Sequence, residues 1–249
     1  MASFQGTLHV GNMCNNNYKL YKALRSEGVN AQFVNFERIT QENAISDPAT
    51  IDPSFNIKDP WIHNIRVVSD SVAIQQAYEL FSLGRLIKEL KDQYWIHAQT
   101  DYPLYVSLFC TNYSAHSTGS DLRIDYYKKD IRSQFLSRAY GRAKVVYYNN
   151  IDLFDHVLSE KGSDLVFLPN IVDPLHYRAT ETPKQANSQL GKLRVLMPSR
   201  ITFFGEKDIK GNRLLLEALR QLNGLEMTLV LAADDPESSR WVDLVAENC

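Results

Sequence analysis

Apolar positions recur with two different spacings along the first 170 residues, and stretches of the two kinds alternate. Short apolar runs predict strands, at 7–10, 31–36, 94–97, 113–116, 144–148 and 165–168. Apolar residues at helical spacing predict helices, over 18–24, 73–90, 132–142 and 152–159. The polar stretch 37–60 has no clear period and is expected to be a long loop. This alternation predicts an α/β domain, Rossmann-like, with a mainly parallel sheet covered by helices on both faces.

A polar stretch rich in Thr, Pro, Gln and Asn, at 178–191, separates this pattern from a shorter one. After it, a strand pattern at 193–197, a helix pattern from Asn212 and an apolar run at 227–232 form a second β-α-β unit. The expected division is a first domain at 1–175, a linker at 176–191 and the start of a second Rossmann-like domain at 192–249.

The second domain is expected to be incomplete. Roughly 60 residues bury only a marginal fraction of their surface. Two parallel strands with one or two helices cannot cover both faces of the apolar run at 227–232. We therefore expect a further C-terminal segment, or another subunit, to cover it.

Composition describes an ordinary globular protein, with 44% hydrophobic and 22% charged residues. A net charge of −2 gives no reason to expect a nucleic acid partner. Three scattered cysteines and an N-terminus without a signal-peptide pattern favour the reducing cytoplasm. No apolar run has the ~18 residues of a membrane span, and peripheral association with a membrane stays open.

Several familiar chemical motifs are missing from the sequence. There is no P-loop, no G-x-G-x-x-G after a strand and no G-x-S-x-G. The six histidines lack the close spacing of metal ligands, and no Asp-x-Asp pair occurs, so no metal cofactor is expected. These absences disfavour P-loop enzymes, dinucleotide oxidoreductases and serine hydrolases.

The stretch 193–219 has the pattern of a phosphate site. A predicted strand runs into Arg200, a loop contains Lys207 and Lys210, and a helix begins just after Gly211. The N–H groups at the start of a helix and basic side chains both bind phosphate oxygens. Surface salt bridges and solvated lysines are the alternative interpretation.

Two further candidate segments follow predicted strands of the first domain. Gly11 and Asn12 follow the first strand, where a glycine lets a ligand approach the backbone and an asparagine can cap the next helix. His116 ends another strand, at the edge where open α/β sheets bind ligands. The loop after it contains Ser117, Asp121 and Arg123. An ordinary turn at Gly11 and a structural histidine at 116 remain the alternatives.

Taken in order, these segments resemble the retaining GT-B glycosyltransferases, in particular glycosyltransferase family 4. The matching segments are Gly11-Asn12 with the following KLYKALRSEGVNAQFV, HSTGSDLR at 116–123, RAYGRAKVVYYNNID at 138–152, FLPNIVD at 167–173, and VLMPSR…KG at 195–211. The resemblance covers nearly the whole chain. It implies a cleft between two Rossmann-like domains, the first binding a glycan or lipid-linked acceptor and the second a nucleotide-sugar donor.

The resemblance also implies roles for individual residues. Arg200 and Lys210-Gly211 would hold the leaving diphosphate, with Lys207 in place of a basic residue that the family often has where Ile209 stands. Gly11 and Asn12 would lie against the donor. His116 would be catalytic, beside the transferred sugar, with Ser117, Asp121 and Arg123 near the acceptor. Retention would come from front-face attack, without a metal.

The sequence departs from the family in one respect. The family carries two glutamates in an E-x7-E pattern late in the second domain, and no two glutamates of this chain have that spacing. Family members are also longer, which implies that the chain is truncated. A non-catalytic module that binds a glycan or a nucleotide is therefore the alternative function, and a nucleotide-sugar epimerase of the same architecture is a third.

Overall fold

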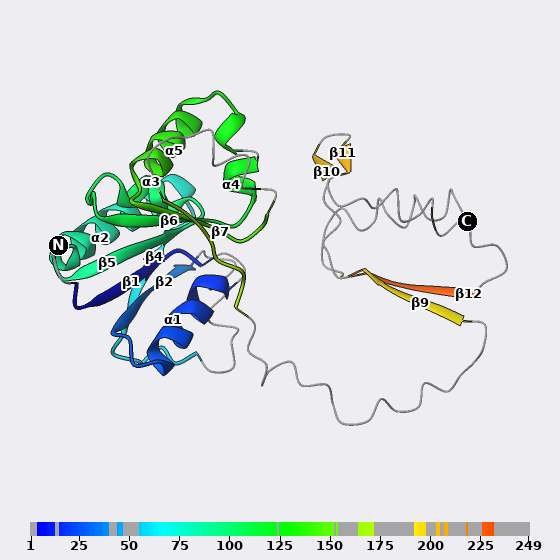
Figure 1. Cartoon of the computed structure of the whole chain (residues 1–249), viewed down its shortest axis with the longest axis horizontal. Helices are drawn as coiled ribbons and strands as arrows, with labels where there is room; N and C mark the ends of the chain where they lie inside the picture. Colours follow the sequence, from blue (N-terminus) through cyan, green and yellow to red (C-terminus); the bar gives the residue numbers. More distant parts are fainter. Residues whose placement is uncertain are drawn as a thin grey trace. The chain divides into compact units, whose positions relative to one another are not determined.

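The structure of the chain, a computed structural model, falls into two compact units, residues 1–177 and 178–249 (Figure 1). It describes residues 4–12, 15–39, 44–46, 55–123, 125–151, 153, 164–171, 192–197, 203–204, 207–208, 218 and 226–231.

The first unit is built on one sheet of eight strands, in the order β3-β2-β1-β5-β6-β7-β8 with β4 also paired to β2. Every pairing is parallel except that of β2 with β3. The strands are β1 Gly6–Val10, β2 Ala31–Ile39, β3 Ala44–Ser46, β4 Ile62–Val68, β5 Tyr94–Gln99, β6 Tyr113–Ser117, β7 Val145–Tyr148 and β8 Asp164–Phe167. The helical segments are α1 Asn16–Ser26, α2 Val72–Leu90, α3 Tyr102–Val106, α4 Ser120–Arg123, the 3-10 turn η3 Asp125–Tyr127, and α5 Ile131–Arg142.

The chain winds in two directions from β1. It first passes through α1 to β2 and β4, and it then crosses through α2 to β5 on the other side of β1 and continues to β8. The strand order therefore reverses between β1 and β5. In open α/β sheets this switch point, at the carboxyl ends of the strands, is where ligands bind.

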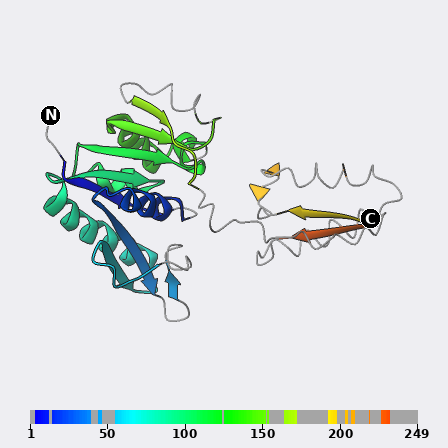
Figure 2. The ribbon, with the colours of Figure 1, turned by 60° about the horizontal axis from the view of Figure 1, so that its bottom comes forward.

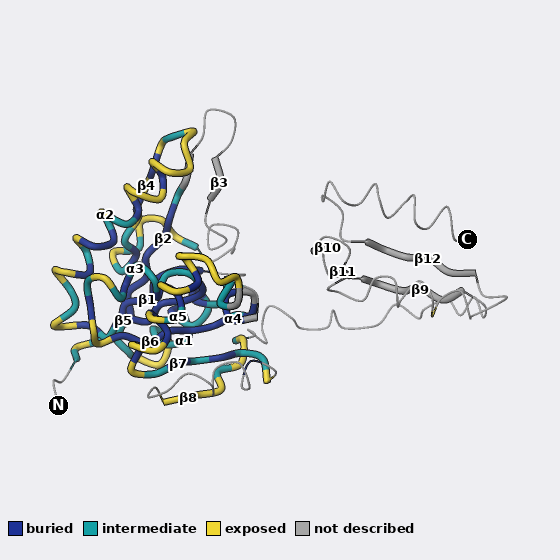
Figure 3. Tube along the Cα trace, turned by 90° about the horizontal axis from the view of Figure 1, so that it is seen from above, coloured by how far each residue is buried: buried dark blue, intermediate teal, exposed yellow. Residues whose placement is uncertain are grey.

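The two faces of this sheet are covered by different helices (Figures 1 and 2). One face forms the larger core, in which Leu8, Ile96 and Ala115 pack against Leu83 and Ile87 of α2, among others. The other face carries α1, whose Tyr18 and Tyr21 pack on Ala31, Phe33 and Ile62. The central strands are buried on both sides (Figure 3). The predicted parallel, two-sided α/β sheet is confirmed.

Two details of the first unit differ from the sequence prediction. The stretch 37–60 is not all loop, because β2 continues to Ile39 and β3 pairs with it antiparallel. Strand β4 was not predicted, since in its sequence IHNIRVV polar residues interrupt the apolar ones. Its pairing with β2 decides its conformation.

Helix α2 also buries a different stripe than its apolar residues predict. The buried positions are Gln75, Glu79, Leu83, Gly84 and Ile87, whereas Phe81 is 73% exposed. Most of the buried residues follow an i, i+4 repeat, and two of them, Gln75 and Glu79, are polar. Among the described residues, no helix is long and apolar enough to cross a membrane.

The second unit contains the two predicted parallel strands, now β9 Lys192–Met197 and β12 Glu226–Leu231, paired along their full lengths. It also contains a short antiparallel pair, β10 Phe203–Phe204 and β11 Lys207–Asp208. Lys207 therefore lies on a strand, whereas the sequence suggested a loop. Of the predicted helix after Gly211 only residue 218 is described, and it is helical. The helix predicted over 152–159 lies outside the described residues, apart from residue 153.

Candidate functional site

The carboxyl edge of the sheet carries several candidate residues, of which His116 lines a cavity. A small cavity there is lined by Asn16 and Leu20 of α1, by His116 of β6, and by residues 168–171 after β8. Its volume is about 10 Å³. That is room for about one water molecule or one hydroxyl group.

Gly11 is fixed by two independent constraints. Its φ of +81° lies in the region that favours glycine. A Cβ at this position would also lie 2.4 Å from Cδ2 of Tyr102 and 2.9 Å from the carbonyl oxygen of Gln99. The loop after β1 therefore packs directly against the end of β5 and the start of α3, and only glycine fits there.

The asparagines that follow Gly11 organise the start of α1. Asn12 Oδ1 accepts from the backbone N–H of Tyr18 at 3.0 Å, and Asn12 Nδ2 donates to Asn15 Oδ1 at 3.2 Å. Asn17, which is fully buried, donates through Nδ2 to the carbonyl oxygens of Gly11 at 2.7 Å and Val10 at 3.2 Å. The predicted binding residue Asn12 is thus also a structural residue. Asn17 holds the loop after β1 through its two hydrogen bonds to the backbone.

Thr100, directly after β5, has a left-handed backbone with φ of 60°. This conformation is unusual for a β-branched residue and costs about 1–3 kcal/mol. It is held by a hydrogen bond from the Thr100 N–H to the His116 carbonyl oxygen at 2.9 Å. The Tyr140 hydroxyl oxygen lies 3.3 Å from the Thr100 carbonyl oxygen, and its proton is directed to Asp121 Oδ2. Backbone strain of this kind is concentrated at functional sites.

His116 is the last of three histidines that lie side by side on neighbouring strands. The register pairs His9 of β1 with His97 of β5, and His116 lies on β6 next to β5. The ring centres are 5.2 Å apart for His9 and His97, and 5.3 Å apart for His97 and His116. The three rings are at most 4% exposed. Of the three, only His116 was predicted from the sequence to be functional.

These histidines are uncharged. Burial lowers the pKa of His9 to about 4, against a weaker opposing effect of the hydrogen bond that His9 Nδ1 makes to Asn17 Oδ1. Burial, with a small contribution from His9, lowers the pKa of His116 to about 4. Burial lowers the pKa of His97 well below its ordinary value, and the two neighbouring imidazoles act in the same direction. His116 is therefore a neutral hydrogen-bonding group near pH 7.

One ring nitrogen of His116 is available to a ligand. Nδ1 lies 3.3 Å from Nε2 of His97, within hydrogen-bond distance. Nε2 is buried and has no hydrogen-bond partner. An unsatisfied buried polar atom is unfavourable by about 1–3 kcal/mol. Such an atom on a residue that lines a cavity for one polar group indicates a place where a ligand or water bonds.

Ser117 and Asp121 bond to each other in the loop after β6. Asp121 Oδ1 accepts from the Ser117 hydroxyl at 2.9 Å and from the Gly119 N–H at 3.0 Å. Asp121 Oδ2 accepts from the Tyr140 hydroxyl. Burial raises the pKa of the Asp121 carboxyl, while the bonds from Tyr140, Ser117 and the loop N–H groups lower it. The two predicted residues are thus bonded within the protein, and they hold the loop that follows His116.

The remaining predicted site residues belong to other parts of the chain. Arg123 ends α4, and its side chain is not among those described. Arg200, Lys210 and Gly211 lie outside the described residues, and for Lys207 only the strand β11 is given. Their assignment to phosphate binding stays a prediction. The residues that sequence reasoning missed are His97, Thr100 and Ser114, which act through tertiary contacts.

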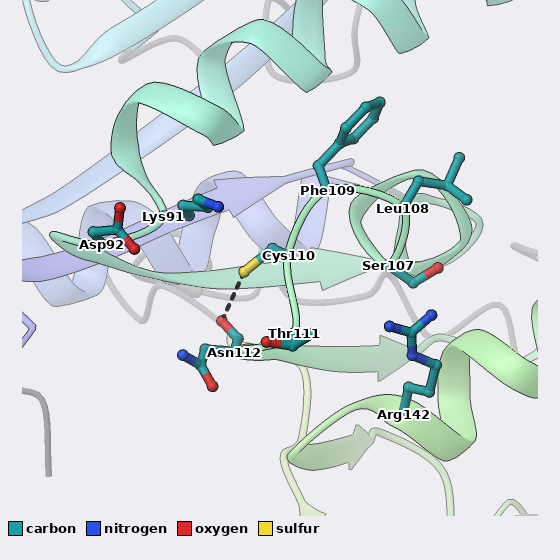
Figure 4. Close-up of a pocket in the computed structure, with 9 residues that line it drawn as sticks. All are labelled: Lys91, Asp92, Ser107, Leu108, Phe109, Cys110, Thr111, Asn112 and Arg142. Atoms are coloured by element: carbon teal, nitrogen blue, oxygen red, sulfur yellow. Dashed lines mark hydrogen bonds between the residues drawn. The ribbon is translucent and has the colours of Figure 1, made fainter.

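A larger cavity, of about 230 Å³, lies at the opposite edge of the sheet (Figure 4). It is lined by the ends of α2, α3 and α5 and by the segment before β6, including Lys91, Cys110 and Arg142. The Cys110 thiol donates to the Asn112 carbonyl oxygen at 3.4 Å. Lys91 and Arg142 stand at the C-terminal ends of helices, where positive charge offsets the helix dipole. This structural role explains the two cations without a ligand, so size alone does not make this cavity the site.

In the described part of the chain, no three His, Cys, Asp or Glu side chains are arranged to hold a metal ion. The groups described at the carboxyl edge offer hydrogen bonding by a neutral imidazole, by the backbone and by amides.

Comparisons with known proteins bear on the fold. No protein-family model matches the chain, and no curated protein does. Among solved structures, the chain is similar to the lipopolysaccharide outer core galactosyltransferase WaaB, with 12% identity and a TM-score of 0.56, over 97% of this chain and 64% of that one. It is also similar to a trehalose-6-phosphate structure from E. coli bound with UDP-2-fluoro glucose, with 10% identity and a TM-score of 0.56, over 97% and 68%.

A third similar structure is LpCGTa in complex with UDP, with 11% identity and a TM-score of 0.53, over 97% of this chain and 69% of that one. The chain thus spans 64% of the length of the galactosyltransferase WaaB and about as much of the others. The likeness extends over both units, and it concerns architecture because the identities are so low. The chain has the fold of the GT-B glycosyltransferases.

Proposed function

We propose that this chain is the acceptor-binding part, and the beginning of the donor-binding part, of a cytoplasmic retaining glycosyltransferase that uses a nucleotide-sugar. The observation that supports it best is the neutral His116, whose unbonded Nε2 belongs to a residue at the carboxyl edge of a sheet with the glycosyltransferase fold. A polar atom that can bond a single hydroxyl group suits a sugar, and its residue lines a small cavity together with Asn16 and Leu20 of α1.

In this proposal the residues divide into two groups. His116 contacts the transferred sugar, and Gly11 and Asn12 allow the donor to approach the backbone after β1. Ser117 and Asp121 position the loop after His116, with Arg123 toward a glycan or lipid-linked acceptor. The second group, Arg200, Lys207, Lys210 and Gly211, binds the diphosphate, whose negative charge grows in the transition state.

The proposed reaction needs no metal and no protein nucleophile. The acceptor oxygen bonds to the anomeric carbon on the face that the leaving diphosphate departs from, and the carbon–oxygen bond to the diphosphate breaks. The proton of the acceptor hydroxyl passes to the departing phosphate oxygen. Since two of the similar structures hold UDP or a UDP-sugar, UDP-sugars are the first donors to test.

The test is donor turnover by the complete protein that carries this sequence, measured as nucleoside diphosphate release. Arg200→Ala and Lys210→Ala are each expected to lower kcat/KM by about 30- to 1,000-fold, as for loss of a group that stabilises transition-state charge. A chelator is expected to leave turnover unchanged. If both variants turn over donor at the rate of the unaltered protein, the phosphate assignment is wrong.

One observation favours a second function, a binding module without catalysis. In glycosyltransferase family 4, two glutamates in an E-x7-E pattern hold the sugar and the ribose. No two glutamates in this chain have that spacing. Titration calorimetry separates the two functions. Binding of UDP or GDP that weakens in Lys210→Ala supports the transferase, whereas binding of simple sugars without any nucleotide supports the module.

A further inference from the structure

The hydrogen-bond network behind His116 contains enough groups of fixed polarity to determine which nitrogen of each histidine carries the proton. Each ring is neutral at pH 7, since burial lowers all three pKa values. A neutral imidazole donates through one nitrogen and accepts through the other. One hydrogen-bond partner that can only donate, or only accept, therefore determines which nitrogen of the ring carries the proton.

His9 illustrates how such a direction is set. The Asn17 amide nitrogen donates to two carbonyl oxygens, those of Gly11 and Val10. Its oxygen therefore faces His9 Nδ1, at 2.9 Å, and Nδ1 must carry the proton. His9 Nε2 then accepts from the Thr7 hydroxyl at 3.0 Å.

The proton position on His97, the middle one of the three histidines in the column His9–His97–His116, is determined through Ser114. The indole nitrogen of Trp95 can only donate, and it donates to Ser114 Oγ at 3.0 Å. The Ile96 carbonyl oxygen can only accept, and the Ser114 hydroxyl donates to it at 3.4 Å. The one remaining contact of Ser114 Oγ, to His97 Nδ1 at 3.0 Å, must then be accepted by the serine. His97 carries its proton on Nδ1.

The reverse assignment makes fewer bonds. If Ser114 gave its proton to His97 Nδ1, the contact with the Ile96 carbonyl would not be a hydrogen bond at all. The assignment that places the proton on His97 Nδ1 satisfies every contact of the serine. It agrees with the independent assignment of His9, so neighbouring rings share one tautomer.

We propose that Ser114 and His97 are positioning residues that hold His116 in the tautomer with its proton on Nδ1, so that its Nε2 offers a lone pair to a ligand hydroxyl. His97 Nε2 has no proton in this arrangement, and His116 Nδ1 must donate to it across 3.3 Å. The unpartnered Nε2 is then an acceptor. The site accordingly selects a ligand with an O–H donor, such as a sugar hydroxyl, over one that presents only a carbonyl or ether oxygen.

This inference rests on the proposed function only in naming the hydroxyl as that of a sugar. The tautomer itself belongs to the ligand-free protein and can be measured without any substrate. Nitrogen chemical shifts of the imidazole rings distinguish a protonated nitrogen from a bare one. The His116 signals are identified by their loss in His116→Gln.

The unaltered full chain is expected to show His116 with a protonated Nδ1 and a bare Nε2 at pH 7.5. A protonated Nε2 in that spectrum overturns the proposal, and this measurement needs no folded variant. Two substitutions of similar shape then test whether His97 determines the tautomer of His116. His97→Gln keeps an acceptor oxygen for His116 and is expected to keep its tautomer. His97→Met removes the acceptor and is expected to move the His116 proton to Nε2.

An unchanged His116 tautomer in His97→Met also overturns the proposed role of His97. If that variant does not fold, Ser114→Ala serves in its place, since it frees His97 Nδ1 from its acceptor. Thr111→Val, at an exposed site on the opposite edge of the sheet, is the control for general perturbation.

In the complete enzyme, His97→Met is expected to lower kcat about tenfold relative to His97→Gln, as for the loss of one well-placed hydrogen bond. Equal kcat in the two variants shows that the tautomer does not matter to the reaction and overturns the positioning role. A protein that transfers no sugar at all, but shows the expected spectra, overturns the proposed function and leaves the tautomer assignment intact.

Discussion

The two faces of the first unit's sheet are both buried, yet they are stabilised in different ways. Neighbouring residues alternate between them, as Ile96 and His97 do on β5. Ile96 packs with aliphatic and aromatic side chains under α2, α3 and α5. His97 bonds to Ser114 and His116. Burial of an aliphatic side chain contributes about 1.5–3 kcal/mol, whereas a buried hydrogen bond contributes about 0.5–1.5 net.

The two faces differ along β1, β5 and β6, where one face carries the three histidines and is called the polar face, although the same side also holds the apolar cluster under α1. The difference indicates that this group of histidines is not built for stability. A second layer of aliphatic residues on the same strands would stabilise the sheet more than a column of neutral histidines. The polar face ends at the carboxyl edge with an unsatisfied nitrogen on His116, which is itself unfavourable in the free protein. We infer that the histidine column serves the site and that the apolar face holds the sheet together.

The largest expected effect comes from substituting two neighbouring residues of β5 that face opposite sides of the sheet. Ile96→Ala is expected to lower the free energy of unfolding of the first unit by about 2–5 kcal/mol, because Ile96 is fully buried and leaves a cavity. His97→Gln, one position along, is expected to lower it by about 1–2 kcal/mol. Urea denaturation followed by circular dichroism measures both. A greater loss in His97→Gln would show that the polar face carries the stability.

The second prediction concerns pH, to which only the polar face should respond. The pKa values of His9 and His116 fall to about 4 on folding from an ordinary value of 6.5, and that of His97 falls as well. Between these pH values the unfolded state binds more protons, so stability is lost as pH falls below about 6.5. The expected loss between pH 7 and 5.5 is about 1 kcal/mol per histidine, on the order of 3 kcal/mol together.

The same variants isolate this effect from other titrating groups. His97→Gln is expected to lose about a third of the pH dependence that the histidine column contributes. Ile96→Ala is expected to lower stability by the same amount at pH 7 and pH 5.5. Denaturation midpoints at the two pH values, compared across the three proteins, provide the measurement. A His97→Gln protein with the full pH dependence would mean that His97 is not buried as a neutral ring.

The third prediction compares two glycines with nearly equal backbone angles. Gly11 and Gly28 have φ of +81° and +79°, but a Cβ on Gly28 would meet nothing within 4 Å, whereas on Gly11 it would collide with Tyr102. Gly28→Ala therefore measures backbone strain alone, about 1 kcal/mol. Gly11→Ala is expected to be less stable by a further 1–3 kcal/mol, because the carboxyl edge must shift. Thermal denaturation of the two variants checks it, and equal melting temperatures would contradict the close packing at Gly11.

Much of the fold could be predicted from the sequence because short, mostly apolar strand patterns alternate with stretches at helical spacing. The strand at 94–97 and the helix at 132–142 are examples, and both form within two residues of the expected bounds. Strand β4 could not be predicted, since its conformation depends on pairing with β2, which lies about thirty residues earlier.

The candidate site could be predicted only where one residue carries the signal. Gly11 and His116 follow strands, and their positions alone placed them at the carboxyl edge. His97 and Ser114 were missed because their importance depends on register, which brings β5 and β6 together. A usable signal was present: histidines occur on three predicted strands, at 9, 97 and 116. The roles of Arg200 and Lys210 rest on sequence resemblance and stay predictions.

The smallest expected effect lies on α2, where the sequence and the structure disagree about which residues are buried. The apolar pattern includes both Phe81 and Leu83, but Phe81 is 73% exposed and Leu83 is fully buried. Phe81→Gln removes little buried area and introduces a good helix former, so the free energy of unfolding is expected to change by less than about 0.5 kcal/mol. Leu83→Ala is expected to lower it by about 2–5 kcal/mol. Urea denaturation of this pair separates the two descriptions, because a loss above 2 kcal/mol in Phe81→Gln would mean that the apolar pattern, and not the i, i+4 repeat through Gln75 and Glu79, marks the buried side of the helix.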